Sequence, residues 1–238
     1  MSRHDAERTF ARRSFLSKLG ISLTAGGAGL GTAVASAQTP GNGEGGRWQS
    51  ARHTADDWLD QIPGKHRLVL DTTTPQGFGD ALAFLNNYFT VNQNAYGLRD
   101  ADLAVVLVAR HLSTLFAFND SMWAKYGGTI TQRTNFNDPK TKQPPTINLY
   151  NSTSHGPALT NRGNTLDSLL KRGLHLAVCQ VSTRGNAGTI AMATGATADA
   201  VYTELVANLV TRNAHMVPAG IVAVNRAQER GYSLVAAG

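Results

Sequence analysis

Several features that assign a chain to a common class are absent here. Cys179 is the only cysteine among 238 residues, so the chain cannot form an internal disulfide. After residue 37, no segment has the roughly 20 strongly apolar residues that a membrane span needs. The same part has no run of Lys and Arg and no alternation of basic and aromatic residues, which disfavours nucleic-acid binding. A P-loop and a serine-centred nucleophile elbow are also missing.

What the chain does have is an N-terminal segment with the three parts of an export signal. Arg12 and Arg13 precede a weakly apolar stretch over 19–34, and Ala35 and Ala37 form a small-x-small cleavage site. The stretch is short and rich in Gly, Ala, Ser and Thr, so we expect no stable membrane insertion. We expect cleavage after Ala37, which makes residues 1–37 a signal peptide.

The order of residues 12–18, RRSFLSK, resembles the twin-arginine (Tat) signal, which a receptor reads as an address. The resemblance implies export of folded protein by the Tat translocase, to the periplasm or otherwise out of the cytoplasm. Residues 1–37 hold five of the 22 Lys and Arg and two of the 16 Asp and Glu, so the remaining chain has a net charge of +3. Half of the basic excess therefore belongs to the signal.

The rest of the chain is predicted to form one domain behind a linker. Residues 38–64 read as a flexible tether with a short helix near 54–59. Residues 65–238 are long enough to bury a single core. Apolar runs predict strands over 67–71, 102–109, 174–179, 214–217 and 232–236, and periodic segments predict helices over 78–96, 112–126, 166–172, 199–210 and 218–230. This alternation predicts an α/β three-layer sandwich with a mostly parallel five-stranded sheet.

A long insertion interrupts this alternation. Residues 127–164 are polar, rich in Asn, Thr, Pro and Gly, and almost without periodicity. A structureless connection of this length is unusual in a compact domain. We expect an ordered loop that covers a site, and a disordered insertion is the alternative.

Chemistry-bearing residues follow the predicted strands, where ligands bind in open α/β sheets. Arg110 and His111 follow the second strand, and Cys179 ends the third. Nearby cations and helix N-termini favour the nucleophilic thiolate, and Arg184 lies five residues beyond the cysteine. We therefore expect Cys179, His111 and Arg184 to form a reactive site. A buried, inert thiol and a merely structural histidine are the alternatives.

The segment after Cys179 is predicted to be a glycine-rich turn. Gly185, Asn186 and Gly188 would present backbone N–H groups to an anion, together with Arg110. An ordinary flexible turn is the alternative. His155, in the long insertion, is expected to fold over this ligand site.

The remaining histidines give no metal motif. His175 lies inside an apolar strand and is predicted to be structural, whereas His215, which we place with the residues at the end of the fourth strand, is ambiguous. One cysteine and scattered histidines lack the close spacing of a zinc site. We expect no metal and no cofactor, although a ligand set assembled in space stays open.

Two segments carry a family likeness. Residues 173–188, GLHLAVCQVSTRGNAG, and 215–235, HMVPAGIVAVNRAQERGYSLV, resemble the DsrE/DsrF-like sulfur-relay superfamily. The resemblance implies a small α/β domain that assembles into trimers or hexamers. It also implies that Cys179 accepts and passes on a persulfide. The chain departs from the cytoplasmic carriers in its export signal and in its insertion over 127–164.

Two functions follow as hypotheses. In the first, the protein is an exported sulfur carrier or thiol-redox protein that uses Cys179, with His111 and Arg184 favouring the thiolate. In the second, it is a periplasmic small-ligand-binding or accessory module without catalysis, whose pocket lies under the insertion.

Overall fold

The computed structural model describes residues 49–210 and 212–238, and the predicted signal peptide over 1–37 lies outside them. The described part has an α/β fold around a five-stranded sheet with the order β4-β3-β2-β1-β5, in which every pair of neighbours is parallel. The strands are β1 (His66–Thr72), β2 (Leu103–Ala109), β3 (Leu174–Cys179), β4 (Ala214–Val217) and β5 (Ser233–Ala237). The predicted α/β sandwich with a mostly parallel sheet is confirmed.

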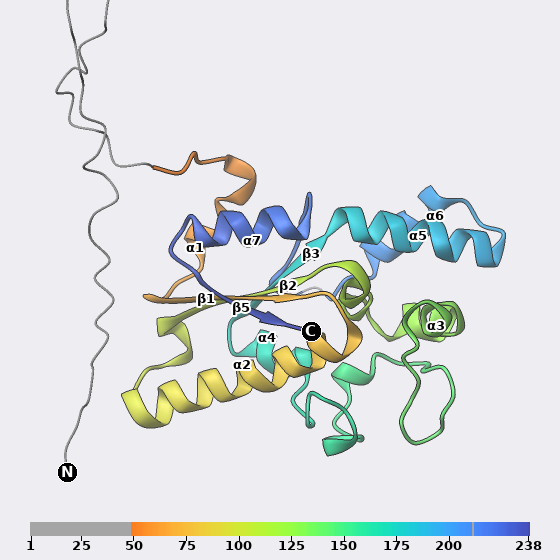
Figure 1. Ribbon diagram of the computed structural model, residues 1–238, viewed down its shortest axis with the longest axis horizontal. Coiled ribbons are helices and arrows are strands. Elements are labelled where there is room, and N and C mark those ends of the chain that lie inside the picture. Colours follow the sequence, from red (N-terminus) through yellow and green to blue (C-terminus); the bar gives the residue numbers. More distant parts are fainter. Residues whose placement is uncertain (1–48, 211) are drawn as a thin grey trace, which may run out of the picture. The chain divides into compact units, whose positions relative to one another are not determined.

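Helices cover both faces of this sheet (Figure 1). One face carries the larger core, which takes in α2 (Pro75–Tyr96), α3 (Asp120–Thr134), α4 (Leu166–Lys171), α5 (Gln180–Thr194) and α6 (Ala198–Ala207). The other face carries the smaller core, under α1 (Trp58–Gln61) and α7 (Gly220–Gln228). None of these helices is long and apolar enough to span a bilayer, within the residues described.

The connections explain this division. The first four strands follow one another across the sheet, and β5 then returns to pair with β1. Right-handed crossovers place helices on one face while the chain moves one way and on the other face when it reverses. The helix α7, between β4 and β5, is therefore on the opposite face from α2 and α4. All seven residues of the central strand β2 are buried, as both faces are covered.

The long insertion differs from its prediction. The expected helix over 112–126 is divided into a 3-10 helix, His111–Ala117, and the helix α3, which continues to Thr134. The prediction missed the last eight residues of α3 because Gly127 and Gly128 mask the apolar spacing. Gly127 is required there, since a Cβ atom would collide with the carbonyl oxygen of Pro145.

The rest of the insertion packs on the domain through aromatic side chains. Phe136 and Tyr150 lie with Phe116, their ring centroids 5.0 and 4.7 Å from it. Two further 3-10 turns, Leu149–Asn151 and Gly156–Ala158, shape this segment. The insertion thus contributes to the larger core, although its sequence is polar.

Candidate functional site

Cys179 lies at the carboxyl edge of the sheet, where it ends β3 and caps the N-terminus of α5. Its Sγ accepts a hydrogen bond of 3.4 Å from the backbone N–H of Ser182. The residue is 4% exposed. A helix N-terminus leaves its first N–H groups without partners inside the helix and carries partial positive charge. The sulfur therefore lies where a negative charge is stabilised.

Arg110 brings a guanidinium beside this thiol as one half of an ion pair. Its Nε and Nη2 donate to the two carboxylate oxygens of Asp71, at 2.7 and 2.8 Å. The pKa of Arg110 is raised, first by the hydrogen bond with Asp71 and then by the charges of Asp71 and Cys179. Asp71, Arg110 and Cys179 follow the alternation of β1, β2 and β3 onto the sheet face that carries α1 and α7.

A second helix begins at the same edge. Val217, the last residue of β4, pairs with Cys179, and α7 starts three residues later at Gly220. A Cβ atom at Gly220 would lie 2.6 Å from the Cβ of Arg110, so glycine is needed for the guanidinium arm to pass. Two helix N-termini, a guanidinium and a thiol therefore meet at this edge.

His111 holds this edge together through its backbone. It adopts a left-handed conformation with φ of 57°. Its N–H donates to Ser182 Oγ at 2.7 Å, and its carbonyl accepts from Asn186 Nδ2 at 3.5 Å. The exposed imidazole has no hydrogen-bond partner in the described part of the chain. The structure thus gives His111 a positioning role and provides no contact for the predicted acid–base role.

The predicted anion-binding turn is wrong, because residues 180–194 form the helix α5. The backbone N–H groups of Gly185 and Gly188 lie beyond the first four residues of α5, so they bond inside the helix. Asn186 is 1% exposed, and its Oδ1 accepts from Arg133 Nε at 2.7 Å. Sequence reasoning missed Arg133, which lies in the part of α3 that was expected to be a loop.

Two further predicted site residues have partners other than Cys179. Arg184 lies 3.7 Å from Asp199 and 4.0 Å above the ring of Tyr202. Five residues along a helix correspond to about 140° of rotation beyond a full turn, so α5 directs Arg184 towards α6. His155 is 8% exposed and bonds Asp138 and Ser154 inside the insertion, at 3.1 and 2.9 Å. The structure does not bring these two side chains into contact with the thiol.

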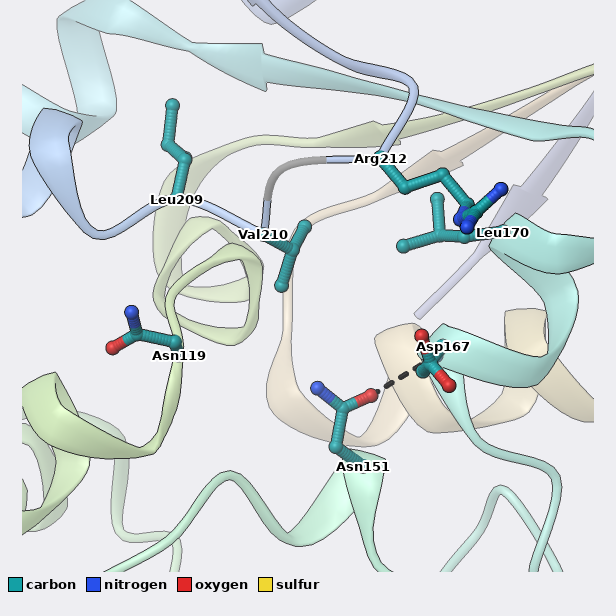
Figure 2. Close-up of a pocket in the computed structure, with 7 residues that line it drawn as sticks. All are labelled: Asn119, Asn151, Asp167, Leu170, Leu209, Val210 and Arg212. Carbon is teal, nitrogen blue, oxygen red and sulfur yellow. Dashed lines mark hydrogen bonds between the residues drawn. The ribbon is translucent and has the colours of Figure 1, made fainter.

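A separate cavity of about 360 Å³ lies beside the insertion (Figure 2). Asn151 comes from the insertion, and its Oδ1 accepts from the backbone N–H of Asp167 at 3.0 Å. Leu170 forms an apolar part of the wall, and Arg212 contributes a guanidinium. The full lining is Asn119, Asn151, Asp167, Leu170, Leu209, Val210 and Arg212. This lining can take a small ligand that is polar on one side and apolar on the other.

In the described ranges, no three His, Cys, Asp or Glu side chains gather as a conventional metal site. Comparisons with family models, with curated proteins and with solved structures find no match to this chain. The likeness to the sulfur-relay superfamily therefore depends on the two sequence segments alone.

Proposed function

We propose that this protein is an exported, DsrE/DsrF-like sulfur carrier in which the Cys179 thiolate accepts and passes on a sulfur atom. The observation that carries the proposal is the position of Sγ, which caps α5 beside the Arg110 guanidinium. A helix N-terminus and a nearby cation are the two features that activate cysteines. The likeness of residues 173–188 and 215–235 to the superfamily supports the same chemistry.

The proposed step needs no oxidant. The Cys179 thiolate attacks the outer sulfur of a persulfide donor, R–S–SH. The bond from Sγ to that sulfur forms while the bond to the donor's inner sulfur breaks, and R–S⁻ leaves with the electron pair. Transfer to an acceptor thiolate reverses these roles, so Cys179 returns to its starting state.

Arg110 and Asp71 have distinct tasks in this proposal. The guanidinium balances the negative charge on Sγ or on the persulfide. Asp71 holds the guanidinium in one orientation by the two-pronged hydrogen bond. The low exposure of Cys179 means that the cover over the sulfur must open for a donor to enter. Assembly into trimers or hexamers and Tat export to the periplasm complete the proposal.

Alkylation of the native protein, read by intact mass, tests the site. We expect labelling of Cys179 near neutral pH without denaturant, and a gain of one sulfur atom after exposure to a persulfide donor. Arg110→Gln slows alkylation about tenfold, since it removes the guanidinium beside the attacking sulfur and leaves the Asp71 carboxylate there without its partner. Arg184→Gln is the matched control, because that arginine lies on α5 but contacts α6, and it leaves the rate unchanged. Labelling only after denaturation would refute the proposal.

The second candidate function is a periplasmic small-ligand-binding module, favoured by the cavity beside the insertion. Arg212 places a positive charge in its wall, and Leu170 gives it an apolar side. Asp167 adds a carboxylate that also pairs with Lys171. This lining suits a small zwitterion such as a free amino acid. Thermal-shift titration with free amino acids should raise the melting temperature, and Asp167→Asn with Arg212→Gln should remove the shift. No shift with any amino acid would exclude this ligand class.

A further inference from the structure

His175 and His215 form a pair on the sheet face that carries α1, away from Cys179. His175 is the second residue of β3 and His215 the second residue of β4. The sequence placed His215 with the residues that end its strand, but it lies near the start and pairs with Ala177. Both side chains are half-buried, so the pair is reachable from solvent.

The two imidazoles meet nitrogen to nitrogen. His175 Nδ1 and His215 Nε2 are 3.0 Å apart, whereas the ring centroids are 5.2 Å apart and the planes differ by 14°. Both nitrogens therefore lie between the two centroids, and the rings are nearly coplanar. In this arrangement, the in-plane bonding directions of the two nitrogens point along one line, so with both rings neutral an N–H of one ring donates to the lone pair of the other.

Trp58 covers this line from one side. Its ring lies 4.0 Å from the His215 ring and 6.3 Å from the His175 ring, at 14° and 21° to their planes. The face of an indole attracts a cation within about 6 Å of its centroid, and tryptophan is the best of the aromatic residues at this. The cluster thus offers two nitrogen donors and one aromatic face to a positive ion.

The charge state of the pair fits a ligand site. Burial lowers the pKa of His175 to about 4, with His215 as a second cause, and burial also lowers the pKa of His215. Both rings are therefore neutral near pH 7, which is the form that binds metals. No ion pair with a carboxylate involves either ring in the described ranges.

We propose that His175 and His215 bind one monovalent d¹⁰ cation, Cu(I) or Ag(I), in linear coordination under the face of Trp58. Imidazole nitrogen suits copper. A divalent ion would lack compensating negative charge here, because the ligands are neutral, and a tetrahedral zinc ion would lack two of its four ligands.

Binding needs two small changes. The proton between the rings moves to the far nitrogen of its own ring, so each ring stays neutral. Metal–imidazole bonds of about 2 Å require the nitrogens to separate by about 1 Å. The strand β4 has four residues and lies at the edge of the sheet, where β3 alone pairs with it among the strands that the structure describes.

A cavity reaches one ring of the pair. His175 lines a space of about 320 Å³, together with Pro63, Asp100 and Arg172. Arg172 bonds both carboxylate oxygens of Asp100 at 2.9 and 3.0 Å, so this carboxylate is neutralised and does not compete for the ion.

Silver ion is the probe for the test, because it is stable in air and shares the d¹⁰ configuration of Cu(I). The titration uses Cys179→Ser protein, which removes the competing thiol, and follows binding by calorimetry and by tryptophan fluorescence. We expect one Ag⁺ per chain with quenching of Trp58. His215→Gln should weaken binding at least tenfold, Trp58→Leu should weaken it less, and the exposed His53→Gln should leave it unchanged.

Nitrogen NMR of the histidine rings in the same Cys179→Ser protein gives a readout that does not depend on whether the histidine variants fold. One equivalent of Ag⁺ should shift the signals of His175 Nδ1 and His215 Nε2 and leave His53 unaffected. Unchanged shifts at these two nitrogens would overturn the proposal. So would equal loss of affinity in His53→Gln and His215→Gln, or no binding once Cys179 is replaced.

Discussion

The two ends of β3 place different chemistry on the same face of the sheet. At the carboxyl end, Cys179 meets a helix N-terminus and the Arg110 guanidinium, both of which favour a negative charge. Near the amino end, His175 meets the neutral His215 and the face of Trp58, which favour a bound cation. One strand thus carries an anion-stabilising site and a cation-binding site four residues apart. The strand direction decides which end of β3 stabilises an anion, because the helices that follow parallel strands begin at the carboxyl edge of the sheet.

The largest expected effect is at the sulfur end. Cys179→Ser should abolish both alkylation and the gain of a sulfur atom, since the chain has no other thiol. It should change stability little, because a serine hydroxyl can also cap α5. Intact mass after donor treatment measures the first effect, and urea denaturation measures the second. Sulfur uptake that persists in Cys179→Ser would show that Cys179 does not accept the sulfur atom.

Acid should act on the histidine end. The folded pKa of His175, about 4, lies below its ordinary value of 6.5, so the unfolded chain binds the proton more readily. The stabilising contribution is complete above pH 6.5 and is lost as the pH falls towards 4. Its size is well below the roughly 3 kcal/mol that about 1.4 kcal/mol per pKa unit would give, because solvent screens this half-buried ring. Urea denaturation across this range measures it, and His175→Gln should flatten the dependence. An equally steep loss of unfolding free energy in His175→Gln would show that groups other than His175 cause the pH dependence.

Arg110→Gln should affect both stability and reactivity. It leaves the carboxylate of Asp71 without its partner, and this side chain is only 11% exposed, so water replaces the partner poorly. Loss of this charged hydrogen bond should cost about 2 kcal/mol. The double variant Asp71→Asn/Arg110→Gln should recover part of the stability but not the alkylation rate. Recovery of the rate as well would show that the guanidinium charge is not what activates the thiol.

Gly220→Ala is the mildest perturbation of the sulfur end. The new methyl group meets the Arg110 side chain and should displace the guanidinium without removing its charge. We expect a severalfold slower alkylation and a stability cost of about 1 kcal/mol, as a crowded core substitution costs. Gly188→Ala is the control on α5, because a methyl group there meets nothing. Equal rates in both variants would mean that the position of Arg110 does not matter.

Much of the fold could be predicted from the sequence because its strands are short apolar runs between clear breaks. The run over 102–109, for example, matches the buried strand β2 to within one residue. The helix α5 could not be predicted in the same way. Its first turns include Ser, Thr, Gly and Asn, which are typical of turns, and Cys179 provides an unusual N-cap.

The candidate site was predicted only in part, for a related physical reason. Cys179 and Arg110 follow directly from the ends of strands, and the structure places them together. Arg184 was expected to lie beside Cys179 because residues after 179 were predicted to form a turn. These residues form the helix α5 instead, which directs the Arg184 side chain towards Tyr202. The pairing of His175 with His215 depends on the register of β3 and β4, which are 40 residues apart at these positions, and no local pattern carries that information.

The most direct test of the sulfur site is the rate of Cys179 alkylation in the folded protein near neutral pH. It should be measured for the natural sequence, Arg110→Gln and Arg184→Gln. We predict labelling without denaturant, about tenfold slower labelling in Arg110→Gln, and no change in Arg184→Gln. A thiol that reacts only after unfolding, or equal rates in all three proteins, would contradict the claim that this edge of the sheet activates the sulfur.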